Sequence, residues 1–381
     1  MRRAAVWCIQ GLLSATVVMA QGVAVGLRVD LTDSLGLNRA EGQFAQLFVP
    51  DYFQPPQDGR LTLVVHLHSA SWAAENQVYK AHANAALVNI HLGALSSPSK
   101  SYFSDQSRFA AMLEVALREL ATRGIVDCPQ LGTLIVTSFS AGYAGVREII
   151  KNGSYYEQLR ALELADGLHC SSDPGLMIAQ MADFVRLARD AAAGRKVMLL
   201  THSSIKTAGY ESTTQTADYL IAAIGAARVP CALADEIGFQ YSRCDTGHFH
   251  LRGYLGDTAD DHLKHLYAMD RMLAQALEIL GSQPSGSPEG IRSESTSLSV
   301  RVYPNPCNPR ATFRCEIPTA GQLRLTVYDV LGQEILAFEG GHVPAGLIEL
   351  AWNPSALPAG VYAYRLQAGG ATAAGHCIVL R

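Results

Sequence analysis

The stretch from Gly132 to Ile150, GTLIVTSFSAGYAGVREII, decides the fold of the larger part of this chain. Its first residues, Gly132–Thr137, form an apolar run with the length and composition of a buried β-strand. A helix follows through Lys151 and is closed by Gly153. Ser140 lies in the segment SFSAG between them, so the sequence predicts a strand, a tight turn and a helix with this serine in the turn.

Strands and helices alternate around this unit. The expected strands are Leu61–His68, Ala86–Ile90, Ala161–Ala165, Lys196–Thr201 and, as the last, Ile237–Ser242. The expected helices are one with an apolar face from Phe109 to Leu120, one capped by Asp173, one over Thr213–Ala226 and a closing one over Ala259–Leu280. Repeated βα units imply an α/β fold with a mostly parallel sheet and helices on both faces.

The composition changes at Ser282–Ser297, SQPSGSPEGIRSESTS, where Ser, Pro, Gly and Glu dominate and apolar periodicity stops. These residues predict a flexible linker. The short alternating strands beyond it predict a small all-β sandwich of about 80 residues. Its expected strands are Ala311–Ile317, Leu323–Tyr328, Ile348–Trp352, Val361–Leu366 and His376–Leu380.

The N-terminus has the pattern of an export signal. Arg2 and Arg3 precede an apolar run from Ala4 to Met19, and Ala20 supplies a small residue for cleavage before Gln21. The run is shorter than the ~20 residues of a spanning helix, so no transmembrane anchor is expected after cleavage. The expected order is a signal peptide over 1–20, an α/β domain over 21–281, a linker over 282–297 and a sandwich over 298–381.

Composition excludes several classes of function. The 381 residues carry a formal net charge of −4 without long blocks of one sign, which argues against nucleic acid or a membrane surface as a partner. Eight cysteines occur without a CxxC pair, so no zinc or redox motif and no cofactor is predicted. Among Cys128, Cys170, Cys231 and Cys244, a disulfide and buried thiols are both open.

Ser140 is the candidate nucleophile. A serine on a sharp turn after a buried strand can reach a carbonyl carbon, while the backbone amide of the next residue, Ala141, donates to the developing oxyanion. The alternative is a serine that only caps the helix. The position after a buried strand favours the nucleophile.

The serine needs a base and an acid. With the last strand placed at Ile237–Ser242, the base is expected in the stretch Cys244–Gly256, which offers His248 and His250; the residues do not separate the two, and we favour His250. The candidate acid is Asp166, which directly follows the strand Ala161–Ala165. Its alternative role is that of a turn residue.

With these residues in place, Val23–Leu280 resembles the α/β-hydrolase superfamily through the strand-SFSAG-helix unit and the order Ser140, Asp166, then His248 or His250. The resemblance implies an esterase-like serine hydrolase acting on a small-molecule or glycan ester. Two features depart from the family pattern. Ser138 stands where GxSxG has its first Gly, and the acid follows an earlier strand than usual.

The loop HLHSASW after the first expected strand resembles the HGxxW-like segment of esterases. That resemblance implies that the backbone amide of Ala70 is the second oxyanion donor, that Trp72 walls the pocket, and that His68 is structural.

The C-terminal sequence resembles, almost from end to end, the type A sorting domain of type IX secretion substrates, a FlgD-like Ig sandwich. The matching segments are VYPNPCNPRATFRCEIP, LRLTVYDVLGQEI, AGVYAYRLQAGG and IVLR. The resemblance implies that residues 298–381 address the chain to the type IX secretion machinery, and so through the periplasm to the outer cell surface or beyond. Tyr303, Phe313, Leu325, Val327 and Tyr364 are expected in its core, Gly332 and Gly360 in turns, and Cys307, Cys315 and Cys377 paired or simply packed.

Two rival interpretations stay open. A metal hydrolase would use the late cluster of His248, His250, His262 and His265 with Asp245, Asp260 and Asp261, although no HExxH-type motif joins them. A non-catalytic surface or carbohydrate-binding protein on the same scaffold is the other, because a fold does not fix a function.

Overall fold

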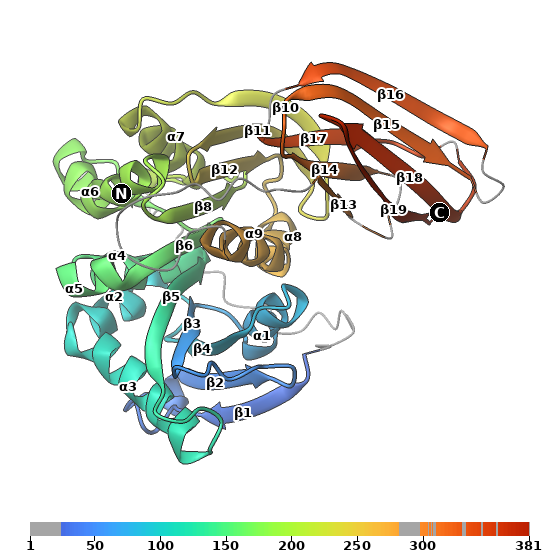
Figure 1. Ribbon diagram of the computed structural model, residues 1–381. Helices are drawn as coiled ribbons and strands as arrows, with labels where there is room; N and C mark the ends of the chain where they lie inside the picture. Colours follow the sequence, from blue (N-terminus) through green and yellow to red (C-terminus); the bar gives the residue numbers. More distant parts are fainter. Residues whose placement is uncertain are drawn as a thin grey trace. The chain divides into compact units, whose positions relative to one another are not determined.

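The computed structural model describes residues 24–281 and 298–380, apart from residues 304, 306, 308–309, 330–332, 344–345 and 356. The predicted signal peptide, the predicted linker and Gly332 lie outside these described residues. The chain divides into two compact units, Met1–Pro284 and Ser285–Arg381 (Figure 1).

A mixed sheet of ten strands organises the first unit, in the order β1-β2-β4-β3-β5-β6-β8-β12-β11-β10. The neighbours from β4 to β12 are parallel, and both ends of the sheet are antiparallel. The strands are β1 Gly26–Asp30, β2 Phe44–Pro50, β3 Arg60–Leu67, β4 Ala85–His91, β5 Gln130–Phe139, β6 Leu159–Ala165, β8 Val197–His202, β10 Val229–Ala234, β11 Phe239–Thr246 and β12 Phe249–Tyr254. A separate two-stranded sheet pairs β7 Cys170–Ser171 with β9 Tyr210–Glu211.

Helices cover both faces of the large sheet, which confirms the predicted fold class. They are α1 Ser71–Lys80, α2 Ser96–Ser104, α3 Ser107–Thr122, α4 Tyr143–Ile150, α5 Gly153–Gln158, α6 Pro174–Ala192, α7 Thr213–Ala223, α8 Ala259–Tyr267 and α9 Met269–Gly281, with short 3-10 turns at Arg39–Glu41 and Ser140–Gly142. One apolar core joins the sheet to α3, α4, α6 and α7, and a second joins it to α1 and α9. The central strands read as apolar runs because both of their faces are buried.

Helix starts follow the local sequence. Asp173 caps α6, its side chain accepting from the backbone N–H of Leu176, and Pro174 fills the first position, as expected.

The predicted last strand is wrong. β11 runs antiparallel between β10 and β12, and the last strand is β12, parallel to β8. Gly247, with φ of 57°, turns β11 back into β12, and a Cβ there would lie 2.2 Å from the carbonyl oxygen of Ala192. The predicted closing helix is also two helices, since α8 ends before Ala268 and α9 begins at Met269.

A buried row of polar side chains crosses the sheet on the face covered by α1 and α9. Asn89, His66, Thr137 and Glu163 pair side by side on β4, β3, β5 and β6. Each is at most 1% exposed. His66 Nδ1 lies 2.7 Å from Thr137 Oγ1, whereas both carboxyl oxygens of Glu163 lack a hydrogen bond within the described residues. Burial raises the pKa of Glu163 well above its usual value and lowers the pKa of His66 to about 3.

The second unit contains two antiparallel sheets, β13-β14-β17 and β16-β15-β18-β19. Their strands are β13 Ser299–Tyr303, β14 Ala311–Ile317, β15 Gly321–Tyr328, β16 Glu334–Val343, β17 Gly346–Trp352, β18 Gly360–Ala368 and β19 Ala371–Val379. Of the expected core residues, Phe313, Leu325, Val327 and Tyr364 are buried in one cluster. The predicted all-β module is confirmed; β13 and β16 were not anticipated.

The cysteines of the described residues are free thiols. Cys307, Cys315 and Cys377 pack in the core of the second unit, and Cys170 and Cys244 are buried in the first. Burial raises the pKa of Cys377 to about 12, which keeps this thiol neutral.

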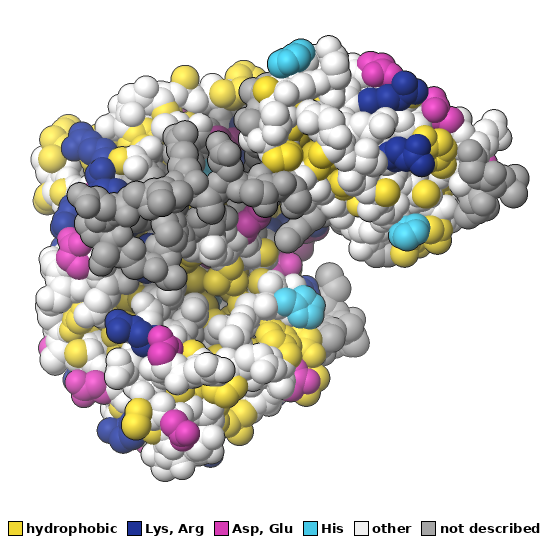
Figure 2. All heavy atoms as spheres, viewed as in Figure 1, with side chains coloured by type: hydrophobic (Ala, Val, Ile, Leu, Met, Phe, Trp, Pro, Cys, Tyr) yellow, Lys and Arg dark blue, Asp and Glu magenta, His cyan; other side chains and the backbone are white. Residues whose placement is uncertain are grey.

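Charged side chains of both signs are interspersed on the face seen in Figure 2. Within the described part of the chain, no helix combines the length and apolar character needed to cross a membrane.

Candidate active site

Ser140 occupies the turn between β5 and α4. The strand ends at Phe139, and Ser140 opens the one-turn 3-10 helix that leads into α4. Its φ of 49° lies in the left-handed region, which costs a non-glycine residue about 1–3 kcal/mol and persists only where the surroundings hold it. The turn therefore presents the Ser140 side chain at the carboxyl end of a central strand, where ligands of open α/β sheets bind.

Backbone atoms of two other segments pack closely against this turn. A Cβ on Gly167 would lie 2.4 Å from the carbonyl oxygen of Ser140 and 2.5 Å from its nitrogen, so the loop after β6 packs directly on the turn. A Cβ on Gly142 would lie 2.5 Å from the carbonyl oxygen of Leu67, so the loop after β3 does the same. Ser138, which replaces the first Gly of the motif, is fully buried and fits beside Gly142.

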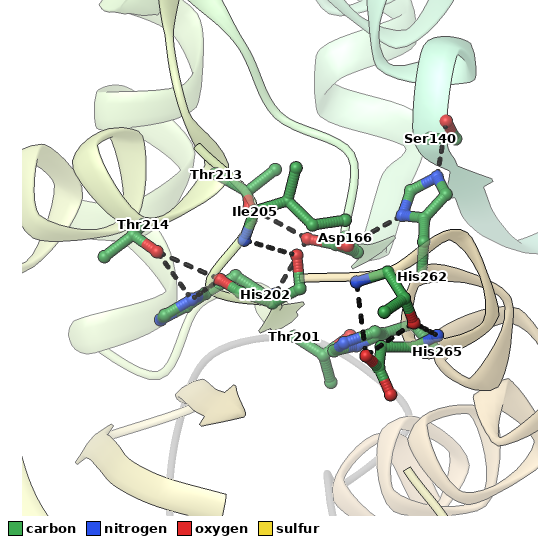
Figure 3. A network of polar contacts seen from close by, with 12 residues as sticks. Ser140, Asp166, Thr201, His202, Ile205, Thr213, Thr214, His262 and His265 are labelled. Atoms are coloured by element: carbon green, nitrogen blue, oxygen red, sulfur yellow. Dashed lines mark hydrogen bonds and ion pairs between the residues drawn. The ribbon is translucent and has the colours of Figure 1, made fainter. Parts of the chain in front are cut away.

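Ser140, His262 and Asp166 form a continuous hydrogen-bonded line (Figure 3). His262 Nε2 lies 2.8 Å from Ser140 Oγ, and His262 Nδ1 lies 2.7 Å from Asp166 Oδ2. An ionised carboxylate can only accept, so Nδ1 carries the proton and Nε2 is free to accept from the serine hydroxyl. The imidazole is therefore held in the tautomer that a general base requires.

The Asp166 carboxylate is fully paired although it is only 2% exposed. Its Oδ1 accepts from the backbone N–H of Ser203 and from the hydroxyl of Thr213, both at 2.8 Å. Burial alone would raise the pKa of Asp166, but the hydrogen bond from His262, the nearby His265 and the Ser203 amide together lower it well below its ordinary range. Asp166 thus stays ionised beside the histidine.

His262 is positioned by the first turn of α8. The Thr258 side chain caps this helix by accepting from the backbone N–H of Asp261, whose carboxylate accepts in return from the Thr258 backbone N–H. The Phe139 ring packs on the imidazole with ring centroids 4.5 Å apart. The last residue of β5 thus supports the histidine that faces Ser140.

The structure places the two predicted bases away from Ser140. His248 lies in the β11–β12 turn near Gly194, and His250, on β12, directs its Nδ1 to Asp245 Oδ1 at 2.7 Å. Neither contacts Ser140. The prediction had placed the last strand too early in the sequence. His248 precedes the last strand β12 and His250 lies on it, whereas His262 lies in the segment that follows β12.

His262 and His265, two of the histidines in the metal-hydrolase interpretation, contact other side chains. Both ring nitrogens of His262 are engaged by Ser140 and Asp166, and His265 Nδ1 lies 2.9 Å from Thr201 Oγ1. Across the described residues, no group of three His, Cys, Asp or Glu side chains is arranged to hold a metal ion. From the sequence, His262 was named only in the late histidine cluster of the metal-hydrolase interpretation.

The predicted oxyanion donors flank the turn. Ala141 follows Ser140 in the 3-10 turn, and Ala70 is the N-cap residue of α1, in the loop that packs on Gly142 through Leu67. Trp72, two residues further on, is 38% exposed and stacks on Tyr267 at 5.6 Å between ring centroids. The direction of the two amides toward a bound carbonyl stays a prediction.

Histidines and tyrosines surround the triad. His68 stacks on His91 at 5.1 Å, and burial lowers its pKa to about 4, with smaller effects of the His91 and His262 charges. His169 makes edge-to-face contacts with Tyr143 and Tyr210 at 5.4 and 5.2 Å. The neutral, aromatic character of these groups makes the walls of the site partly apolar.

Comparison with known proteins identifies the second unit. Residues 301–380 match the family model of the secretion system C-terminal sorting domain. The predicted resemblance to a secretion sorting domain is thereby confirmed, and this domain indicates secretion to the cell surface or the exterior through interaction with the secretion machinery. A structural match to dimeric latent PorU from Porphyromonas gingivalis has 20% identity and a TM-score of 0.19, and covers 22% of this chain and 9% of that one.

The remaining structural matches include hydrolases. The chain is similar to a cold-adapted esterase from an Arctic intertidal metagenomic library, with 13% identity, 62% of this chain and 88% of that chain covered, and a TM-score of 0.37. It is also similar to the enterobactin esterase of Shigella flexneri, with 11% identity, 68% and 61% covered, and a TM-score of 0.41. None of the curated proteins compared with the chain matches it.

Proposed function

We propose that the first unit is a serine hydrolase of the esterase type, with Ser140 as nucleophile, His262 as general base and Asp166 as the residue that orients the base. The observation that carries the proposal is the pair of hydrogen bonds, 2.8 and 2.7 Å, that link the three side chains. A nucleophile, a base within reach of it and an acid that holds the base are what covalent acyl transfer requires.

The first half of the reaction forms a covalent intermediate. As Ser140 Oγ attacks the ester carbonyl carbon, its proton passes to His262 Nε2, and the carbonyl oxygen becomes an oxyanion. The backbone amides of Ala141 and Ala70 are the proposed donors to this oxyanion. His262 then gives the proton to the departing alcohol, which leaves an acyl group on Ser140.

The second half restores the enzyme. His262 takes a proton from water, the resulting hydroxide attacks the acyl carbon, and the proton returns to Ser140 Oγ as the acid leaves. Asp166 stabilises the imidazolium that forms twice per turnover, and its two further hydrogen bonds keep it ionised. The net reaction is hydrolysis of an ester to an alcohol and a carboxylic acid.

A fluorophosphonate probe tests the nucleophile directly. We expect covalent labelling of the full chain and none of Ser140→Ala, because the probe reacts only with a serine activated by a base. Mass spectrometry of the digested protein should place the label on the peptide that contains Ser140. Ser154→Ala is the matched control, since this exposed serine on α5 has no such partner and its loss should leave labelling unchanged.

Absence of labelling in the wild-type protein, with intact secondary structure, would instead favour the non-catalytic surface or carbohydrate-binding alternative.

We also propose that residues 298–381 serve as an address only, joined to a hydrolase domain over 21–281 by a linker over 282–297. In support, the sorting-domain match lies within the second compact unit, which has its own core. A chain that ends at Gly281 should therefore keep ester hydrolysis within about twofold of the full chain, because each unit has its own hydrophobic core. Hydrolysis of a neutral activated ester by the two proteins is the measurement.

Secretion is the second readout of this truncation. In a host with type IX secretion, the shortened chain should remain in the periplasm, and residues 298–381 fused to an inert exported protein should carry it to the surface. Loss of activity or solubility on truncation would assign the sandwich a stabilising part in the hydrolase instead.

A further inference from the structure

Arg147 is a buried cation for which the described residues provide no anionic partner. It lies on α4, seven residues after Ser140, and is 8% exposed. A guanidinium carries five N–H donors and stays charged in proteins. One donor of Arg147, on Nη2, bonds the carbonyl oxygen of His169, while its buried Nε has no partner. Among the described carboxylates none pairs with it, since the neighbouring Glu148 bonds Lys151 at 2.7 Å.

Such a group is costly to bury. Removing an unpaired charge from water is unfavourable unless an opposite charge or several hydrogen bonds replace the lost solvation. Burial indeed lowers the pKa of Arg147, and the nearby Tyr143, Cys170 and Glu148 only partly offset this. One carbonyl acceptor and the face of the Tyr143 ring are its contacts among the described residues, and the buried Nε keeps no hydrogen bond.

Contacts place this cation beside Tyr143 and His169. Side chains on a helix lean toward its N-terminus, which for α4 is the Ser140 end. The guanidinium carbon accordingly lies 5.1 Å from the centroid of the Tyr143 ring, one turn closer to Ser140. Tyr143 and Arg147 both contact His169, the ring at 5.4 Å and the guanidinium at the backbone carbonyl.

His169 connects this cluster to the catalytic line. It lies three residues after Asp166, and burial lowers its pKa, while the Asp166 and His262 charges lie near enough to act on it in opposite directions. Arg147, Tyr143 and His169 are therefore neighbours of the triad on the α4 side. Tyr210, 48% exposed, contacts the His169 ring edge-to-face at 5.2 Å between ring centroids.

We infer that Arg147 binds a carboxylate of the substrate, so that this enzyme prefers esters that carry a negative charge next to the scissile bond. The inference rests on the proposed function and names the substrate class of the same site. A carboxylate matches the planar fork of the guanidinium and supplies the missing counter-charge. Arg147 acts in binding and takes no part in the chemistry at Ser140.

The carboxylate could belong to the acyl group or to the alcohol, and two ester pairs separate these sources. 4-Nitrophenyl hemiglutarate against 4-nitrophenyl valerate compares a charged with a neutral acyl chain of similar length. 4-Carboxyphenyl acetate against phenyl acetate compares a charged with a neutral leaving group, after correction for their intrinsic rates of hydrolysis. We expect wild-type kcat/KM to favour the charged member of one pair by about 10- to 100-fold.

Substitution of Arg147 should remove this preference. In Arg147→Met the charged-to-neutral ratio of kcat/KM should fall toward 1, because the larger loss falls on the charged ester. Arg147→Lys keeps the charge but loses the fork, so its ratio should be intermediate. The matched control is Arg186→Met on α6, which removes a cation that packs on Tyr156 and pairs with Glu157.

Each outcome decides the matter. The inference is overturned if a folded Arg147→Met keeps the charged-to-neutral ratio of kcat/KM. It is also overturned if the wild-type enzyme hydrolyses both neutral esters as well as the charged ones. The role of Arg147 would then be structural, as a hydrogen-bond donor to the His169 carbonyl. If Arg147→Met does not fold, the wild-type ratios and Arg147→Lys still decide. Hydrolysis that survives in Ser140→Ala would overturn the proposed function itself, which is a distinguishable result.

Discussion

Replacing His262 with alanine is expected to lower kcat/KM for an activated ester by a factor on the order of 10⁴ or more. Without the imidazole, the Ser140 hydroxyl has no acceptor at 2.8 Å and attacks as a weak neutral nucleophile. The fold should survive, because the His262 side chain is 24% exposed and lies on a helix whose capping residues are unchanged. Steady-state kinetics, with circular dichroism to verify folding, is the measurement.

The matched controls are His248→Ala and His250→Ala, the two histidines that the sequence favoured. We expect each to stay within about threefold of wild type, since His250 is bonded to Asp245 and His248 lies beside Gly194. Asp166→Asn should cost less than His262→Ala, because an imidazole in the wrong tautomer retains part of its function. If kcat/KM falls as much in His250→Ala as in His262→Ala, His250 is the base, as the sequence predicted.

The contrast between Asp166 and His262 illustrates what a single sequence can reveal about this site. Asp166 could be found because it directly follows the expected strand Ala161–Ala165, and the end of such a strand is a local feature. Ser140 was found for the same reason, after Gly132–Thr137. A polar residue at the carboxyl end of a parallel strand lies at the edge of the sheet where sites form.

His262 lacks that local signal. It lies eight residues after the end of β12, inside an amphipathic helix in which His265 looks equivalent. Only the position of the last parallel strand separates His262 from His248 and His250, and β11 and β12 read as one polar stretch with Gly247 between them. The rule applied to the sequence puts the base after the last strand, and assigning that strand required the pairing of β12 with β8, which is a long-range contact.

Lowering the pH from about 6.5 to 4.5 is expected to destabilise the first unit by several kcal/mol. His66, His202 and His265 are each at most 1% exposed. Burial lowers the pKa of His66 to about 3 and the pKa of His202 and His265 to about 4. It also lowers the pKa of His68 to about 4. In the unfolded chain each would titrate near 6.5. Between these pKa values the unfolded state binds protons that the folded state does not. The free energy of unfolding therefore decreases as the pH is lowered.

The size of the effect follows from the number of groups. One pKa unit corresponds to about 1.4 kcal/mol per group, so four histidines over roughly two units can remove several kcal/mol, against a total stability of about 5–15 kcal/mol. Glu163 opposes this loss, since a carboxyl whose pKa burial has raised is neutral when folded and gains stability as the pH falls. The pKa of Asp166 is lowered in the folded protein, so its contribution to the free energy of unfolding is lost only at still lower pH.

Urea unfolding at several pH values, followed by the helical circular-dichroism signal, measures this dependence, because the helices of the described residues lie in the first unit. The free energy of unfolding should decline steadily below about pH 6.5. His265→Gln keeps a side chain that can bond Thr201 Oγ1 but cannot titrate, so its slope should be shallower by about one proton. Glu163→Gln removes the opposing group and should make the decline steeper. A free energy of unfolding that is flat or rises between pH 6.5 and 4.5 would mean that these histidines are protonated in the folded protein, and that the buried row on the α1 and α9 face is hydrated.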